Sequence, residues 1–151
     1  MSVNYITAAA TQRLQVVVDG MKGLTYAAST GTATVPSLYI GTSSFVNAQG
    51  TTGVTGSSTG VLAVIPLPVA GITVSARSLS LIASAQSANA TGSGTAANAA
   101  VVTSGGVVHT GGLTVGGTAE GTASGKEVVL GASTISSGQS VSITSAVITH
   151  P

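Results

Sequence analysis

The chain has 151 residues, of which only seven carry a fixed charge, four as Lys or Arg and three as Asp or Glu, and it has no cysteine. Disulfides and thiolate metal sites are therefore excluded, and four basic residues are too few for the electrostatic footprint of a nucleic-acid-binding protein. Three carboxylates and two histidines likewise leave little from which to build a catalytic pocket.

The balance of residue types nevertheless indicates a folded domain. Hydrophobic residues make up 43% of the chain and the mean hydropathy is +0.56, whereas disordered chains combine low hydrophobicity with high net charge. The length fits one domain. The only aromatic residues are Tyr5, Tyr26, Tyr39 and Phe45, so the core must consist of Val, Ile, Leu and Ala. Because such a core is thin, we expect assembly with other copies to add stability.

The first predicted element is a helix near the N-terminus. Thr7 is a candidate for its N-cap, and Gly20 or Gly23 can take the left-handed conformation that ends a helix. An alternative treats Val16–Val18 as a strand and Asp19-Gly20 as a hairpin turn. The helix is favoured because apolar residues recur at spacings of three and four, at Ile6, Ala10, Leu14, Val17, Met21 and Leu24.

After Tyr26 the pattern changes to short apolar, mainly β-branched runs, separated by clusters of Gly, Ser and Thr that favour turns. This pattern predicts an antiparallel β-sandwich or jelly-roll-like domain, preceded by a short N-terminal α-helix. We divide the chain into a helical or arm segment, residues 1–24, and a β-sandwich domain, residues 25–151, within one structural unit. The predicted strands are Ser37–Ile40, Val61–Ile65, Ile72–Ala83, Ala99–Val102, Val107–His109, Leu113–Val115, Glu127–Leu130 and Ser140–Thr149.

Two of these runs carry a more detailed pattern. In Ile72–Ile82 the apolar alternation changes phase between Ala76 and Leu79, which predicts a β-bulge within one strand. In Ser140–Thr149 the alternation predicts a half-buried strand. Its apolar face would hold Val141, Ile143 and Val147, and its hydroxyl-bearing face Ser140, Ser142 and Thr144.

The segments between strands give three loop predictions. Ser136–Gln139 lies between two runs and is typical of a hairpin loop. Asn47–Gly60 and Ser84–Ala97 are longer, uncharged and rich in Gly, Ser, Thr and Ala. Loops of this length are candidates for contact with a partner, and the alternative is that they are mobile surface loops.

No arrangement of residues predicts an enzyme. A Ser-His-Asp triad needs an oriented base, and the only histidines are His109 and His150. His109 is most simply a residue at a strand end, and the two histidines and three carboxylates show no metal-ligand spacing. No phosphate-binding glycine motif is present either. We therefore predict a protein that is not an enzyme, assign no catalytic, cofactor-binding or metal residues, and expect no cofactor.

The sequence also lacks the patterns of secretion and membrane insertion. The N-terminus has no charged region followed by a hydrophobic stretch, so we treat the glycosylation pattern at Asn89-Ala90-Thr91 as chance. The most apolar window, Val61–Val74, is shorter than the roughly 20 residues of a membrane span and contains Pro66 and Pro68. We expect synthesis in a cytoplasm and no membrane partner.

The scarcity of charge does predict a kind of surface. Charged residues make up 5% of this chain, against about 25% in an ordinary soluble domain. A surface of Ser and Thr hydroxyls can be covered by another protein without burying unpaired charges. This favours a structural or interaction protein that forms oligomers.

Three stretches also resemble known proteins: Thr7–Gly20, the glycine-rich Gly105–Gly112, and Lys126–Pro151 with its ISSGQ turn and VSITS strand. Together they resemble small structural proteins of tailed bacteriophages that decorate or cement the capsid. The resemblance implies a homo-oligomer, a trimer rather than a dimer, that binds the major capsid protein on the outside of the virion. No site residue is carried over, because that group has no catalytic motif.

The alternative from another class is a carbohydrate-binding or adhesive β-module of a phage tail or surface appendage. Tyr26, Tyr39 and Phe45 lie close in sequence and could converge on one loop face as a sugar platform, although the chain has no Trp. A tail-tube subunit is a third possibility that the sequence leaves open.

Overall fold

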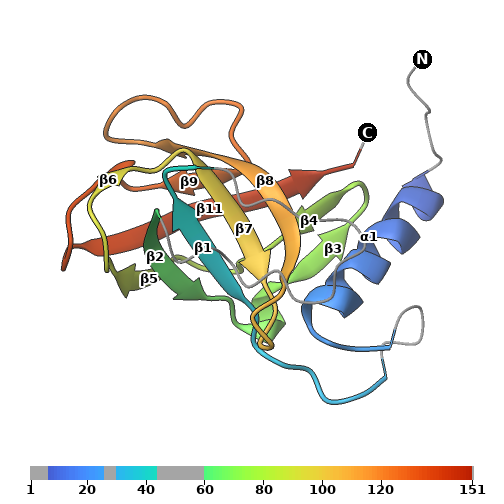
Figure 1. Cartoon of the computed structure of the whole chain (residues 1–151). Helices are drawn as coiled ribbons and strands as arrows, with labels where there is room; N and C mark the ends of the chain where they lie inside the picture. The colour runs from blue at the N-terminus through green and yellow to red at the C-terminus, as the bar shows by residue number, and fades with distance from the viewer. Residues whose placement is uncertain (1–6, 26–29, 44–59, 151) are drawn as a thin grey trace.

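The computed structural model describes residues 7–25, 30–43 and 60–150, which form one N-terminal helix and a set of strands that curl around a common interior (Figure 1). The elements, in chain order, are α1 (Thr7–Met21), β1 (Ser37–Gly41), β2 (Val61–Pro66), the 3-10 turn η1 (Val69–Gly71), β3 (Thr73–Ser75), β4 (Ser78–Ser80), β5 (Gln86–Asn89), β6 (Gly94–Thr95), β7 (Asn98–Val102), β8 (Val108–Gly117), β9 (Val128–Leu130), β10 (Thr134–Ile135) and β11 (Ser140–Thr149).

The main sheet is mixed rather than purely antiparallel. Its strand order is β2-β1-β7-β8-β9-β11-β4-β3, with β5 also paired to β11, while β6 and β10 form a separate two-stranded ribbon. Every pair is antiparallel except β8 with β9, which run parallel. A parallel pair needs a connection longer than a hairpin, and residues 118–127 supply it. The prediction of a mainly β, sandwich-like domain with a short N-terminal helix is confirmed, with this one parallel pair as the difference.

The curled sheet closes on itself next to β2. The backbone amides of Thr91 and Gly92, just beyond β5, both donate to the carbonyl of Leu62, at 2.8 and 3.2 Å. The free side of β2 is thereby joined to the segment that follows β5. Helix α1 contacts β3, β4 and β8, so it lies against the opposite side of the molecule (Figure 1).

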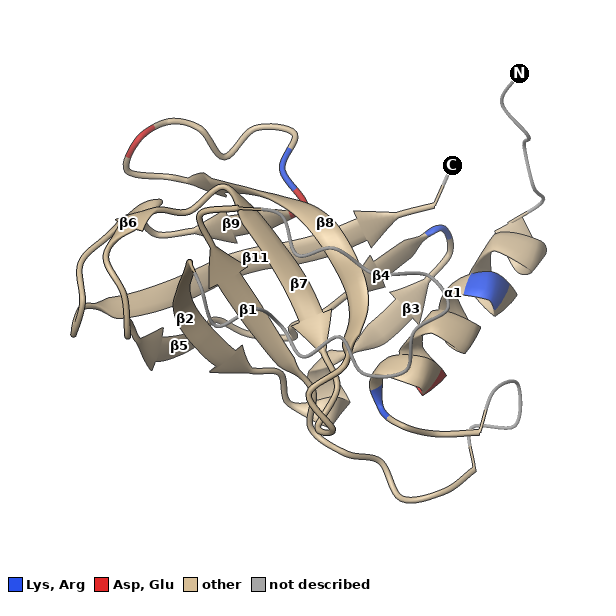
Figure 2. Ribbon diagram, viewed as in Figure 1, with Lys and Arg blue, Asp and Glu red and all other residues tan. Residues whose placement is uncertain are grey.

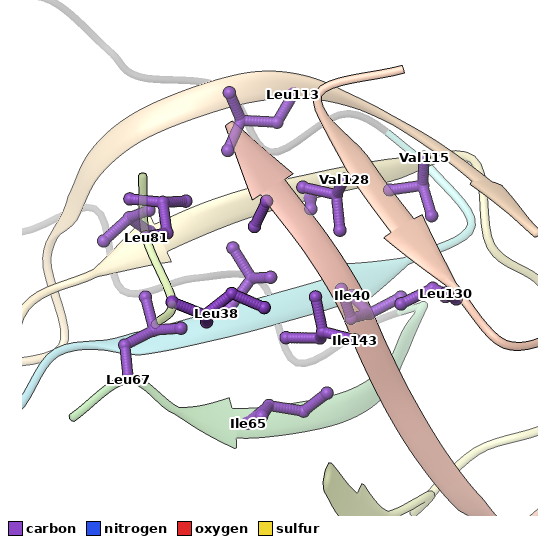
Figure 3. Close-up of a cluster of buried hydrophobic side chains, with 14 of the residues drawn as sticks. Leu38, Ile40, Ile65, Leu67, Leu81, Leu113, Val115, Val128, Leu130 and Ile143 are labelled. Carbon is purple, nitrogen blue, oxygen red and sulfur yellow. The ribbon is translucent and has the colours of Figure 1, made fainter. Parts of the chain in front are cut away.

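Aliphatic side chains from the facing walls fill the interior, and Figure 3 shows the centre of this cluster. Among the described residues, the main cluster contains no aromatic side chain, as the composition predicts. Leu14, Val18 and Met21 of α1 belong to the same cluster as the strands. The division of the chain at residues 24 and 25 stays a prediction. The labelled side chains in Figure 3 are Leu38, Ile40, Ile65, Leu67, Leu81, Leu113, Val115, Val128, Leu130 and Ile143.

The helix ends as one of the two predicted glycines allows. Gly23 has a φ of +67°, and the amide of Leu24 donates to the carbonyl of Asp19 at 2.8 Å while that of Gly23 donates to Gly20 at 3.2 Å. These two bonds form a Schellman motif with Gly23 in the left-handed position. The alternative of a strand at Val16–Val18 is wrong, since these residues lie within α1. Thr7 is the first residue of the helix rather than the residue before it.

The predicted bulge in Ile72–Ile82 is wrong, because this run is a hairpin. β3 pairs with β4, and Ala76 and Arg77 form the two-residue turn between them. Such a turn places Val74 opposite Leu79, so even-numbered positions face odd-numbered ones. A turn of two residues therefore changes the phase of the alternation in the same way as a bulge would.

The pairing of β11 with β9 does contain an irregularity, as do the pairings of β1 with β2 and of β7 with β8. Register shifts between Ile143 and Ser145, so Ala146 is buried after Val141 and Ile143, whereas Val147 is only half-buried. The placement of Val147 on the apolar face is therefore wrong. The predicted runs at Val107–His109 and Leu113–Val115 are not separate, because Val108, His109 and Leu113–Val115 all lie in the single strand β8.

Two loop predictions also change. Ser84–Ala97 is not one loop, since it contains β5 and β6. Ser136–Gln139 does turn, with the amide of Gln139 donating to the carbonyl of Ser136 at 3.0 Å, but it closes no hairpin. The flanking strands β10 and β11 pair with β6 and β5 instead. Asn47–Gly60 lies almost entirely outside the described residues.

Replacement of Ala76 by Gly is expected to stabilise the protein. Ala76 has a φ of +52° at the first turn position, where glycine is favoured and another residue costs about 1 kcal/mol or more. We expect Ala76→Gly to raise the free energy of unfolding in urea by less than that amount, because glycine also increases the conformational freedom of the unfolded chain. Ala85→Gly is the matched control, because Ala85 is exposed and has no positive φ. It should lower stability by up to about 1 kcal/mol, and equal effects of both changes would contradict the prediction.

Candidate functional site

The seven charged residues lie in three places and leave most strands without charge (Figure 2). Arg13, Asp19 and Lys22 lie on or just after α1, and Arg77 lies in the β3–β4 turn. The other three, Glu120, Lys126 and Glu127, lie in the connection between β8 and β9. No group of three or more His, Cys, Asp or Glu side chains comes together among the residues that the structure describes.

Side-chain hydrogen bonds of α1 and of Lys22, the residue after it, lie partly within the helix and partly between it and the β3 region. Asp19 is fully buried, and its Oδ1 accepts a hydrogen bond from Gln15 Nε2 at 3.0 Å. The Nζ of Lys22 donates to the carbonyl of Ile72 at 3.1 Å, which ties the end of the helix to the segment before β3. Thr11 Oγ1 makes a similar link, lying 2.6 Å from the carbonyl of Ala76.

Glu127 joins β9 to β8 at the point where the parallel pair begins. Its Oε2 accepts hydrogen bonds from the backbone amide of Thr114, at 2.8 Å, and from the hydroxyl of the same residue. The bond from the Thr114 side chain is the main reason why the pKa of Glu127 is lowered from its ordinary value, with a minor contribution from neighbouring Lys126.

Glu120 anchors the tip of the same connection. Its two carboxylate oxygens accept hydrogen bonds from the backbone amides of Ser133, at 2.9 Å, and Thr134, at 3.0 Å. These bonds, first that from Ser133, lower the pKa of Glu120 below its ordinary value. The approach leaves no room for a side chain at Gly117, where a Cβ would lie 1.9 Å from Glu120 Oε2 and 2.4 Å from Ser133 N.

His109 is half-buried in β8, with Nδ1 3.0 Å from Thr110 Oγ1. Burial lowers the pKa of His109 below the ordinary 6.5, because it disfavours the charged imidazolium. His150 lies just beyond β11, and its backbone amide donates to Arg77 O at 2.8 Å.

Of the three aromatic residues in the sugar-binding alternative, the structure describes Tyr39. Tyr39 lies on the outer face of the sheet, where it packs against a small cluster of Ala100, Val102 and Val108. Tyr26 and Phe45 lie outside the described residues. The described residues include a single α-helix, which is too short and too polar to cross a membrane.

One surface hollow lies along the outer side of α1. It has a volume of about 510 Å³, and its described lining residues are Ala9, Gln12, Arg13, Gln15 and Val16. This lining comes from the helix face opposite to Leu14 and Val18, with Val16 39% exposed. The sequence analysis identified the N-terminal segment but did not identify this face. The face consists of the helical positions that do not pack into the core.

Comparison of the chain with protein-family models, with curated proteins and with solved structures finds no match. The candidate site therefore rests on the chain's own geometry.

Replacement of Gly117 by Ala is expected to destabilise the protein by about 1–3 kcal/mol, because the added Cβ would overlap the backbone of Ser133. Gly105→Ala is the matched control, since a Cβ there would meet only Thr103 Oγ1, at 3.9 Å, and the residue has no positive φ. Chemical denaturation of both variants measures the difference. If the Gly117→Ala variant is as stable as the control, Glu120 and Ser133 do not approach Gly117 this closely.

The stability of the fold is expected to fall as the solution is acidified through the ordinary pKa of histidine. Because the pKa of His109 is lowered in the fold, the unfolded chain binds the proton more readily, and stability decreases below about pH 6.5. The free energy of unfolding should change by no more than about 1.4 kcal/mol per pH unit, which is the slope for the uptake of one proton. Urea denaturation from about pH 7.5 to about pH 5.5 tests this. His109→Gln should remove the slope and His150→Gln should keep it; the reverse result would contradict the assignment.

Proposed function

We propose that the chain is a non-enzymatic structural protein that binds the outside of a tailed-phage capsid lattice and stabilises the head. The observation that carries this proposal is the extent of uncharged sequence and surface. Residues 23–76, 78–119 and 128–151 contain no Lys, Arg, Asp or Glu. In Figure 2 the charges lie at α1, at the β3–β4 turn and in the β8–β9 connection, away from most of the strands.

An uncharged surface suits a protein that is covered on assembly. Burying such a surface leaves no unpaired charge behind, which is the costly outcome at an interface. Each contact can be weak, because a homo-oligomer that meets repeated sites on a lattice gains affinity from several contacts at once. Binding only to the assembled head would then stabilise the head by mass action.

The partner named in this proposal, the major capsid protein, comes from the resemblance of residues 126–151 to decoration and cement proteins. In this chain that stretch contains β9, β10 and β11, and β11 pairs with three other strands, so it is central to the sheet. We place the contact with the capsid elsewhere, on the outer face of α1. That face borders the 510 Å³ hollow and includes Gln12 and Val16. It also carries Arg13, so a capsid contact there would need an acidic group opposite this one charge, unlike a contact on the uncharged strands.

A deletion of residues 1–24 would test the role of α1 poorly. It would also remove Leu14, Val18 and Met21, which are buried in the main cluster, and so would weaken the fold. A surface substitution separates contact from folding. Val16 and Val107 are both 39% exposed, and only Val16 lies on α1, so they form a matched pair.

The proposal predicts a stable oligomer that binds capsids. Light scattering over an about tenfold range of concentration should give the mass of a trimer, and the protein should co-sediment with phage heads that lack their decoration protein. Val16→Lys should weaken co-sedimentation by about tenfold or more, because it places a charge in the interface, whereas Val107→Lys should leave it unchanged.

The outcomes separate the function from the contact face. Wild-type protein that fails to co-sediment with such heads would overturn the capsid proposal, and binding to a glycan array would then favour the adhesive module. Wild-type binding that Val16→Lys does not alter would exclude the outer face of α1 alone.

A further inference from the structure

The connection between β8 and β9, residues 118–127, is held to the rest of the fold by polar bonds. We call it the β8–β9 strap. Its residues 118–122 and 124–126 are exposed, and none of its residues belongs to either hydrophobic cluster. Segments that bury little apolar surface and expose their hydrogen bonds open locally at lower free energy than a core does. The strap can therefore open while the strands stay closed.

Two of the three carboxylates in the chain serve this one strap. Glu120 accepts the amides of Ser133 and Thr134, at the start of β10, and Glu127 accepts the amide and hydroxyl of Thr114 in β8. A carboxylate accepts such bonds more strongly when it is ionised than when it is protonated. The attachment of the strap at both points thus depends on negative charge.

The surroundings contain little else that titrates. Residues 113–119 and 128–149, which supply the strands and loops packed against the strap, have no ionisable side chain. Lys126 stands next to Glu127, and His150 follows the end of β11. Hydrogen bonds within the fold, and not a network of ion pairs, are the main reason why the pKa of each glutamate is lowered.

We infer that the β8–β9 strap is an acid-sensitive latch, closed while Glu120 and Glu127 are ionised and released from Ser133, Thr134 and Thr114 when they are protonated, with the sheet still folded. The sign follows from linkage. The closed strap holds the glutamates ionised, so acid favours the open form, which accepts protons more readily. The free-energy advantage of the closed form is complete above the ordinary glutamate pKa of 4.5. It is lost as the pH falls through the lower pKa values that the two glutamates have in the closed strap.

The remaining bonds define how far the strap can move. The amides of Thr118 and Ala119 donate to the carbonyls of Leu130 and Gly131, both at 3.0 Å, and these bonds involve no carboxylate. They keep the first residues of the strap attached to the end of β9 at low pH. Thr122 also stays bonded to Gly117, donating its amide to the carbonyl at 3.0 Å and accepting the Gly117 amide on its Oγ1 at 2.9 Å, and the carbonyl of Glu127 accepts the amide of Val147 at 2.8 Å. Acid therefore releases the two carboxylate contacts and exposes the backbone amides that they held, and it does not detach the whole stretch.

The test is a pH titration of the amide resonances of the full chain by NMR. The amide protons of Ser133, Thr134 and Thr114 should move together with the glutamate titrations, at a pH below 4.5, while those of Ile40 and Val101 in the buried strands keep their folded positions. If all of these amides change in one step with global unfolding, or if the first three do not titrate, the latch does not exist.

A variant separates the charge from the side chain. Glu120→Ala should lower the hydrogen-exchange protection of Ser133 and Thr134 at neutral pH by about tenfold or more and leave Val101 unchanged. Glu120→Gln keeps an acceptor but no charge and should give an intermediate loss that no longer depends on acid. Unchanged protection in Glu120→Ala would overturn the inference, because other contacts would then hold these amides.

Discussion

The carbonyl of Leu62 accepts the two hydrogen bonds that close the curled sheet, and the core depends on this closure. Without the amides of Thr91 and Gly92, the free side of β2 would be an open strand edge beside the interior. Gly92 makes the approach possible, since a Cβ there would lie 2.8 Å from the carbonyl of Val61. A cluster of Leu, Ile, Val, Ala and one Met without large aromatic rings can exclude water only if its walls come close. Fully buried alanines such as Ala63 and Ala99 are consistent with that small spacing.

The three acidic side chains share a structural role that the rarity of charge makes conspicuous. Asp19 accepts a bond from Gln15 within α1, Glu127 binds Thr114 across the parallel pair, and Glu120 holds two backbone amides beside β10. An ionised carboxylate bound to backbone amides makes stronger hydrogen bonds than a hydroxyl would. Glu120 and Glu127 thus hold the β8–β9 connection, none of whose residues belongs to a hydrophobic cluster, whereas Asp19 bonds within a helix that itself packs into the core.

The local patterns in the sequence predicted local structure well. The three-and-four spacing of Leu14 and Val18 gave the helix, and β11 has the predicted bounds, because each pattern reflects which side of one element is buried. The hairpin of β3 and β4 was missed because a two-residue turn shifts the apolar phase as a bulge does. The roles of Glu120 and Glu127 could not be predicted, since their partners lie 13 or 14 residues away and are mostly backbone amides, which no side-chain pattern marks. The one available signal was the isolation of these acids within a glycine-rich segment.

Whether charge takes part in assembly depends on which surface makes the contact. Acid acts on the fold through His109 and then through the two glutamates, and in each case protonation favours the open or unfolded form. A contact made by the uncharged strands would change little with salt or pH, because it contains no charges to screen or titrate. A contact made by α1 would include Arg13 and would weaken or strengthen with salt according to the charge of its partner. The salt dependence of assembly consequently distinguishes the helix from the strands as the binding surface, even before the partner is known.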